Sequence, residues 1–298
     1  MGHSKPIETT RWHLENAPLP NHGNTYTVVS HSEVIANTFK LLADSGFMVT
    51  REIYRASKNA SVAQGVYHIY PEQTTDIDVE NEKELGMMFA WTNSYDKSKS
   101  FVCAIGAYVQ VCYNGMLCGD MMNYKRKHRW SASRDIYMHM SDQIKNGEKY
   151  YKRLIKDKES MKNVNLSFRE QAELAGRLFI EEQLVNTHQL ACLKREIEKP
   201  SYDYNCSRET AWAFYNNVTH ALKQTHPREW LNDQQNFHDF FTVELQGSPA
   251  SKQMFEKPQE YEDLGDPSQI IIDEDADMIV EVNEETLQMD IDFEEIEI

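Results

Sequence analysis

One short basic segment contains the residue types that most directly indicate a chemistry. Between residues 124 and 130 the chain reads Tyr-Lys-Arg-Lys-His-Arg-Trp, so four fixed positive charges lie beside two aromatic rings. Lysine and arginine neutralise phosphates, whereas tyrosine and tryptophan can stack on unpaired bases. The segment therefore predicts contact with single-stranded nucleic acid.

More cations follow this segment at spacings of three and four residues, from Lys145 to Lys156. On a helix such a spacing aligns them in one ridge, although a solvated helix face is the commoner meaning of a lysine run. The candidate nucleic-acid-binding residues are Tyr124, Lys125, Arg126, Lys127, Arg129, Trp130, Lys149, Lys152 and Arg153.

The charge of the chain is unevenly distributed. The formal net charge is −16, and from Glu256 to Ile298 there are 17 Asp and Glu residues against one Lys, so residues 1–255 balance to zero. From Tyr124 to Arg169, by contrast, there are 13 Lys and Arg residues against 5 acids. A basic belt and an acidic tail in one chain suggest a surface for a polyanion and a segment that competes for it.

The acidic tail also carries apolar residues, and two interpretations of it remain open. It is either a partner-binding tail, with Phe293, Ile296 and Ile298 facing the partner, or one or two acidic edge strands that complete a sheet or a dimer.

Motifs of established chemistry are absent from the sequence. It contains no phosphate-binding glycine loop, no G-x-S-x-G and no H-E-x-x-H, and no histidine has zinc-ligand spacing with a cysteine. Asp76, Asp78 and Glu80 alternate, but the glycine and final glutamate of a calcium loop are missing. We therefore expect no catalytic residue, no metal and no cofactor.

The bulk composition indicates a folded chain of 298 residues, with 40% hydrophobic and 11% aromatic residues. No apolar run approaches the roughly 20 residues that span a bilayer, and the first residues lack the apolar core of a signal peptide. The five cysteines are odd in number and form no C-x-x-C pair, which is typical of free thiols in a reducing cytoplasm.

The periodicity of the apolar residues predicts an α+β fold. A helix begins at the capping pair Ser30 and Glu33 and ends at Gly46. Period-two strands follow at 47–56, 65–70, 85–92 and 100–113, with a tight turn at Asn114-Gly115 and a short strand within 116–122. This order predicts an N-terminal helix and an antiparallel β-meander.

From about residue 131 the pattern becomes helical, with a break expected at Gly147 and caps at Ser167 with Glu170 and at Ser207. The expected organisation is an N-terminal arm over 1–25, an α+β core over 26–255 whose C-terminal half is mostly helical, and an acidic tail over 256–298.

Several segments together resemble a known family. They are an N-S-x-D segment at 93–96, Gly106, a V-C-x-N-G turn at 111–115, a histidine in the basic run, and a W-x-x-Y-N-x-x-T segment at 212–219. This order resembles the phage- and plasmid-associated family known as domain of unknown function 932, over about residues 30–225. The family-motif residues are Asn93, Ser94, Asp96, Gly106, Cys112, Asn114, Gly115, His128, Trp212, Tyr215, Asn216 and Thr219.

The resemblance implies a setting in mobile genetic elements of bacterial cytoplasm, but no established reaction, so no catalytic residue is carried over. Tyr113 departs from the family, which usually has a small polar residue there. For the motif residues themselves we favour a structural role, because Asn and Gly at turns need no functional reason.

These observations favour a non-catalytic accessory protein of a bacteriophage or plasmid that binds or anneals single-stranded DNA and carries a regulatory acidic tail. The order of elements is similar to that of phage single-strand annealing proteins, which leaves a homo-oligomer open. The alternative is an anti-defence or protein-interaction factor whose tail mimics nucleic acid. A metal-dependent hydrolase or nuclease, with Asn93 and Asp96 near the acidic segment at 76–80, is the third.

Overall fold

The N-terminal part of the chain forms one antiparallel sheet. A computed structural model describes residues 7–20, 28–72, 82–96, 99–118 and 132–247. Its strands are β1 (Ile7–Thr9), β2 (Phe47–Ala56), β3 (Val62–Pro71), β4 (Leu85–Ser94), β5 (Val102–Val109) and β6 (Asn114–Met116). Their order in the sheet is their order in the chain, and each neighbouring pair is antiparallel. The predicted meander is confirmed.

Helices dominate the rest of the described chain. They are α1 (Arg11–Glu15), α2 (His31–Asp44), α3 (Ala132–Lys145), α4 (Gly147–Asn163), α5 (Phe168–Ile180), α6 (Thr187–Glu198), α7 (Ala211–Leu222) and α8 (Pro227–Gly247). The predicted α+β class with a mostly helical C-terminal half is therefore confirmed. Within the described ranges, no helix is both long and apolar enough to cross a bilayer.

Helix starts and breaks follow local chemistry. The Ser30 hydroxyl accepts a hydrogen bond from the backbone of Glu33 at 3.0 Å, and Ser167 and Glu170 form the complete reciprocal capping box of α5. A Cβ at Gly147 would lie 2.4 Å from Cδ1 of Ile105, so the Ile105 side chain would have to shift to admit one. Helix α3 ends at Lys145 and α4 begins at Gly147. The break predicted at Gly147 is thus confirmed.

The cap of α7 differs from the expectation. The sequence predicted Ser207 as its N-cap, but the helix begins at Ala211 and the hydroxyl of Thr210 accepts from the backbone of Ala213 at 3.2 Å. The prediction was wrong because the backbone before Thr210 is held elsewhere: the N–H of Leu166 donates to the carbonyl of Glu209, which fixes this segment as an extended bridge.

The turn between β5 and β6 also differs from the expectation. The sequence predicted a tight turn centred on Asn114-Gly115, but the residue with the positive φ of a turn is Tyr113, at 57°. Asn114 is already in β6, opposite Val109. The prediction was wrong because Asn114 and Gly115 serve long-range contacts. A Cβ on Gly115 would lie 2.9 Å from the ring of Trp230, so a glycine is required for packing rather than for the turn.

The described part of the N-terminal arm contains regular structure. Ile7–Thr9 pairs with β2, and the short helix α1 is capped by the hydroxyl of Thr10. Leu14 on this helix is fully buried. The arm therefore contributes one edge strand and one core residue, although the sequence pattern suggested a loop.

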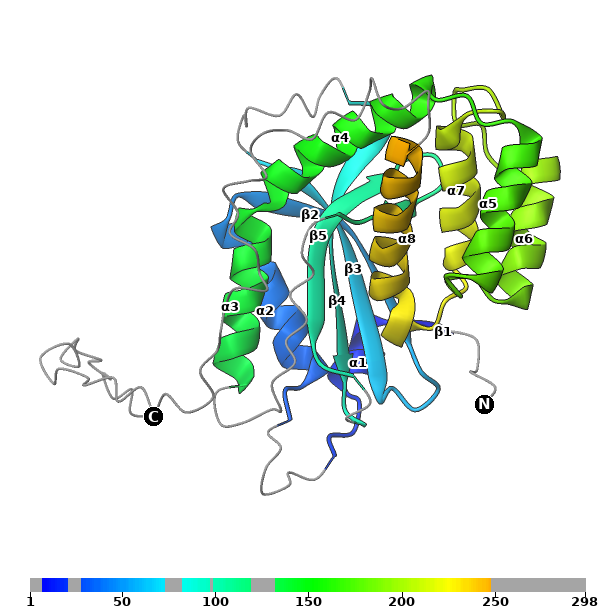
Figure 1. Cartoon of the computed structure of the whole chain (residues 1–298). Coiled ribbons are helices and arrows are strands. Elements are labelled where there is room, and N and C mark those ends of the chain that lie inside the picture. The colour runs from blue at the N-terminus through cyan, green and yellow to red at the C-terminus, as the bar shows by residue number, and fades with distance from the viewer. Residues whose placement is uncertain (1–6, 21–27, 73–81, 97–98, 119–131, 248–298) are drawn as a thin grey trace, which may run out of the picture. The chain divides into compact units, whose positions relative to one another are not determined.

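The centre of the sheet is covered on both faces. All ten residues of β4 are buried. Helices α2, α3 and α4 contact the sheet over a core that includes Phe89, Trp91 and Ile105, whereas α8 covers the opposite face through Trp230 and neighbours such as Met88. Figure 1 shows α8 running alongside β3 and β4, and α5, α6 and α7 grouped beside the sheet.

Candidate functional site

The first group of family-motif residues forms a buried junction between α2 and the end of β4. The side-chain amide nitrogen of Asn93 lies 3.0 Å from the carbonyl of Val29 and 3.0 Å from Nδ1 of His31. Nε2 of His31 lies 2.9 Å from the carbonyl of Ala60. Because a carbonyl only accepts, Nε2 carries the proton and Nδ1 accepts from Asn93. Both amide hydrogens of Asn93 are thereby used.

The imidazole of this junction is neutral. Burial lowers the pKa of His31 to about 4, and the hydrogen bond to Ala60 offsets only part of this effect. The ring stacks on Tyr95 with centroids 3.8 Å apart, and the Tyr95 hydroxyl accepts from the backbone of His31. Ser94 donates to Asp96 at 2.6 Å. These contacts hold two elements together and leave the imidazole no free nitrogen for a ligand.

The second group of motif residues joins β6 to α7. The Asn114 amide donates to the carbonyl of Asn216 at 2.9 Å, and the Asn216 amide donates to the carbonyl of Trp212 at 2.9 Å. The Thr219 hydroxyl donates to the carbonyl of Tyr215 at 3.0 Å. The rings of Trp212 and Tyr215 stack 5.9 Å apart. Backbone carbonyls thus accept the hydrogen bonds of Asn114, Asn216 and Thr219, in agreement with the structural role expected for the motif residues.

The small motif residues lie where other groups approach closely. A Cβ on Gly106 would lie 2.4 Å from the carbonyl oxygen of Met116. Cys112 is buried, and burial raises the pKa of its thiol, which keeps it protonated and unreactive at neutral pH. The described motif residues therefore have the contacts of a structural framework. His128 lies outside the described residues.

Part of the predicted cationic ridge lies on α4, whereas Lys145, which the sequence placed on the same ridge, is the last residue of α3. Lys149, Lys152 and Lys156 are exposed at i, i+3 and i+7, so they follow one face of the helix. Within the described part of the chain none of these three forms an ion pair. We refer to these three residues as the lysine row.

Two other cations of α4 are engaged. Lys158 is buried, with its ammonium 2.8 Å from Glu82 and 3.3 Å from Glu84. Arg153, which the sequence placed among the nucleic-acid contacts, is half-buried, and its guanidinium lies 3.7 Å from Asp157. One helix therefore carries carboxylate-bound cations toward the protein and unpaired ones toward solvent.

The remaining predicted contact residues lie outside the described part of the chain. They are Tyr124, Lys125, Arg126, Lys127, Arg129 and Trp130 of the basic segment, the acids at 76, 78 and 80, and Phe293, Ile296 and Ile298 of the tail. Their proposed roles stay predictions.

An aromatic stack on the sheet was not predicted from the sequence. The ring of His68 on β3 lies 3.7 Å from that of Tyr108 on β5 and 5.3 Å from that of Tyr113. The guanidinium of Arg51 lies 4.5 Å from the Tyr113 ring, which is 49% exposed. Glycine at position 86 makes room, because a Cβ there would lie 2.4 Å from the ring of Tyr108. Gly86, a glycine inside a predicted strand, was the one sequence feature that could have indicated a bulky group packed against the strand at this place.

A buried polar chain connects three helices. The Tyr215 hydroxyl lies 3.0 Å from Nδ1 of His238, and Nε2 of His238 lies 3.1 Å from a carboxylate oxygen of Asp157. The three residue types could relay a proton, but the His238 and Tyr215 side chains are fully buried, and burial raises the pKa of Tyr215. This chain fastens α7 and α8 to α4.

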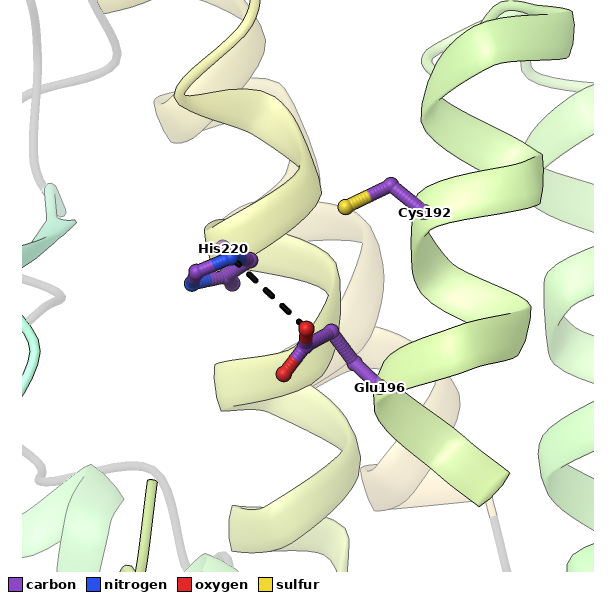
Figure 2. A group of neighbouring side chains, drawn as sticks. All are labelled: Cys192, Glu196 and His220. Atoms are coloured by element: carbon purple, nitrogen blue, oxygen red, sulfur yellow. Dashed lines mark ion pairs between the residues drawn. The ribbon is translucent and has the colours of Figure 1, made fainter. Parts of the chain in front are cut away.

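Three potential metal ligands meet between α6 and α7. They are Cys192, Glu196 and His220, whose donor atoms all lie within 4.8 Å of one another. Figure 2 shows Cys192 and Glu196 extending from α6 toward His220 on α7. Nε2 of His220 lies 3.8 Å from a carboxylate oxygen of Glu196. Burial lowers the pKa of His220, with Lys223 as the next cause. Sequence reasoning missed this group because the cysteine and the histidine lie on different helices with no characteristic spacing.

Comparison with known proteins defines the family of the chain. The family model described as "Domain of unknown function (DUF932)" matches residues 18–243. No curated protein and no solved structure matches the chain. The matched range contains strands β2 to β6, the buried motif junctions and the helices of the lysine row and of the metal-ligand group, so the chain belongs to this family of unknown function.

Proposed function

We propose that this protein binds single-stranded nucleic acid without cleaving it, and that the lysine row on α4 contacts the phosphates. The observation that supports this proposal is a regular row of three exposed ammonium groups, none with a carboxylate partner within the described chain. A cation that is already paired must give up its partner to bind a phosphate. An unpaired cation gains the interaction and releases a counterion from the nucleic acid.

The position of the row in the chain also supports the proposal. Helix α3 begins at Ala132, just after the basic segment at 124–130, and α4 follows α3 after the single residue Asn146. The basic segment and the lysine row are thus separated in the sequence by α3, and both lie in the stretch from Tyr124 to Arg169 that has 13 Lys and Arg residues against 5 acids.

The aromatic stack supports single-stranded over double-stranded nucleic acid. An unpaired base can stack on the exposed ring of Tyr113 beside the guanidinium of Arg51, whereas the bases of a duplex are hidden in its stack. The stack lies on the face of the sheet that α8 covers, opposite α4, but near the same end of the strands. The Tyr151 hydroxyl of α4 donates to the carbonyl of Leu85, and Leu85 pairs with Val109 next to the Tyr113 turn.

The family resemblance implies a small polar residue at the position of Tyr113, so the exposed ring of the stack is not carried over from the family. The lysine row therefore carries the proposal. A role in phages or plasmids, where single-stranded DNA arises during replication and transfer, agrees with the setting that the family resemblance implies.

The direct test is fluorescence anisotropy with a labelled single-stranded oligonucleotide at several salt concentrations. The variant Lys149→Gln with Lys152→Gln and Lys156→Gln should lose about tenfold in affinity at low salt. It should also reduce the salt slope by about 2, because each phosphate contact on a single strand contributes about 0.7.

The control removes the same formal charge elsewhere. Arg169, Lys194 and Lys199 are exposed, and two of them pair with glutamates four residues further on, Arg169 with Glu173 and Lys194 with Glu198. Changing all three to Gln should leave the slope unchanged. Equal losses of affinity in the two triple variants would mean that the nucleic acid responds only to the net charge of the protein, and would contradict the role of the lysine row. The absence of binding by the unmodified chain would refute the proposal and favour a protein target.

A further inference from the structure

The contact between α6 and α7 contains a set of donors that the proposed nucleic-acid function does not use. It comprises one thiol, one carboxylate and one imidazole, from Cys192, Glu196 and His220. Such a mixture differs from a cluster of surface acids, because sulfur, nitrogen and oxygen together are the donors of transition-metal sites, whereas calcium and magnesium are bound through oxygen alone.

We propose that Cys192, Glu196 and His220 bind one divalent transition-metal ion, with zinc as the expected metal. Cys192 and Glu196 stand at i and i+4 on α6, so they project from the same face, and His220 reaches them from α7 (Figure 2). Ligand atoms around a tetrahedral zinc are separated by about 3.5 Å, given metal–ligand distances of about 2.0 to 2.3 Å. The 3.8 Å between His220 and Glu196 is close to this value.

The surroundings hold one ligand, the Glu196 carboxylate, in place. Both oxygens of Glu196 are held by Ser201, whose backbone N–H donates at 2.8 Å and whose hydroxyl donates at 2.7 Å. Such outer contacts orient a metal-binding carboxylate and leave lone pairs for the ion. By contrast, Nδ1 of His220 is buried without a hydrogen-bond partner in the described chain. The nitrogen that lies 3.8 Å from Glu196 is Nε2, so Nε2 is the proposed ligand and Nδ1 carries the proton of the neutral imidazole.

The burial of the group indicates how a metal would be held. Cys192 and Glu196 are 3% and 6% exposed, while the His220 side chain is 22% exposed. The three protein ligands would therefore surround the ion on its buried side. Water would occupy the fourth coordination position of the ion, on the side that solvent reaches. The thiol loses its proton on binding, and the thiolate and carboxylate together balance the two charges of the ion.

The site joins the family framework to its neighbouring helix. His220 follows Thr219, the last residue of the W-x-x-Y-N-x-x-T motif on α7, and α6 packs along α7. A metal here would link α6 to α7, the helix whose Asn216 carbonyl accepts from Asn114. Its expected effect is to stabilise the helical half of the fold.

The test uses cobalt(II), because a thiolate ligand gives cobalt a charge-transfer absorption band that oxygen and nitrogen ligands do not. The full chain is freed of metals with a chelator under reducing conditions and titrated with cobalt and then zinc. We expect a band that saturates at one cobalt per chain and disappears as zinc displaces the cobalt. The absence of this band in the unmodified chain overturns the proposal without any variant.

Variants assign the band to its ligands. Cys192→Ser should abolish it, and Glu196→Gln should weaken cobalt binding or shift the band. Cys206→Ser removes a partly buried free thiol outside this group and should leave the band intact. A band that survives Cys192→Ser, or that Cys206→Ser removes, overturns the assignment. Zinc should raise the melting temperature of the unmodified chain and of Cys206→Ser alike, and nucleic-acid binding need not change, so failure of this site and failure of the proposed function are distinguishable.

Discussion

The family motifs and the lysine row differ in almost every physical respect. Asn93, Asn114 and Asn216 are at most 1% exposed, and their side-chain amides donate to backbone carbonyls. Lys149, Lys152 and Lys156 are exposed and have no ion-pair partner in the described chain. The most recognisable residues of the sequence thus have their hydrogen bonds inside the fold, and the least distinctive ones face solvent.

This difference separates the buried motif residues, which identify the family, from the exposed lysines that we propose contact a partner. A buried amide that bonds two elements is costly to replace, because its loss leaves unsatisfied polar groups behind. An exposed lysine costs little to replace, so it constrains the fold little. The motifs therefore report how the sheet and α7 are held together, and function has to be sought on the surface that they support.

The largest expected effect comes from the motif side of the comparison. Trp212→Ala removes a ring that is 1% exposed and stacked on Tyr215, so the free energy of unfolding should fall by about 3–5 kcal/mol. Chemical denaturation measures this change. A loss below about 1 kcal/mol would mean that α7 is not the framework helix described above.

Acidification should break the same framework at the other junction. The pKa of His31 is lowered to about 4 in the folded chain, whereas in the unfolded chain it is near 6.5. Between these two pH values the unfolded state therefore binds a proton that the folded state does not. The stability contributed by this junction is complete above pH 6.5 and falls by about 3 kcal/mol as the pH drops toward 4.

The variant His31→Gln tests the assignment of this pH dependence. A glutamine amide can still donate to the carbonyl of Ala60 but does not titrate, so unfolding should depend less steeply on pH between 6.5 and 4. His188→Gln, at an exposed position on α6, is the matched control and should keep the original slope. Identical slopes in all three proteins would contradict the role of His31.

A smaller loss is expected when one amide is removed. Asn93→Ala leaves the carbonyl of Val29 and Nδ1 of His31 without their donor, which should cost about 1–3 kcal/mol. Urea denaturation measures the free energy of unfolding of this variant and of Ser94→Ala. The second variant removes a hydrogen bond to Asp96 closer to the surface, so its loss of stability should be smaller. Equal losses in the two variants would contradict the importance of burial.

The smallest effect on stability belongs to the lysine row. Changing all three lysines to Gln removes no contact with a carboxylate in the described chain, so unfolding should shift by less than about 0.5 kcal/mol per residue. Thermal melting of the triple variant checks this. A large destabilisation would show that the row belongs to the framework after all.

Local patterns in the sequence were sufficient to predict much of the fold. Phe47–Ala56 was predicted with its observed ends, because Gly46 stops the preceding helix with a φ of 75° and the apolar pattern changes period after it. Ser167 with Glu170 located the start of α5 for the same reason, since a capping box is complete within four residues.

Long-range contacts account for what the sequence did not predict. Asn114-Gly115 has the composition of a tight turn, but Asn216 and Trp230, more than 100 residues away, require those residues in a strand. The lysine row could be predicted because it repeats along one helix. The aromatic stack and the metal-ligand group could not, since each assembles residues from separate elements that only the folded sheet and helices bring together.

The central claim is that the framework and the binding surface are separable, and one paired experiment tests it. Unfolding free energy and oligonucleotide affinity are measured on the triple lysine variant and on Asn93→Ala. We predict that the lysine variant keeps its stability and loses about tenfold in affinity, while folded Asn93→Ala loses stability and keeps its affinity. If the lysine variant binds as tightly as the unmodified chain, the lysine row is not the binding surface and the claim fails.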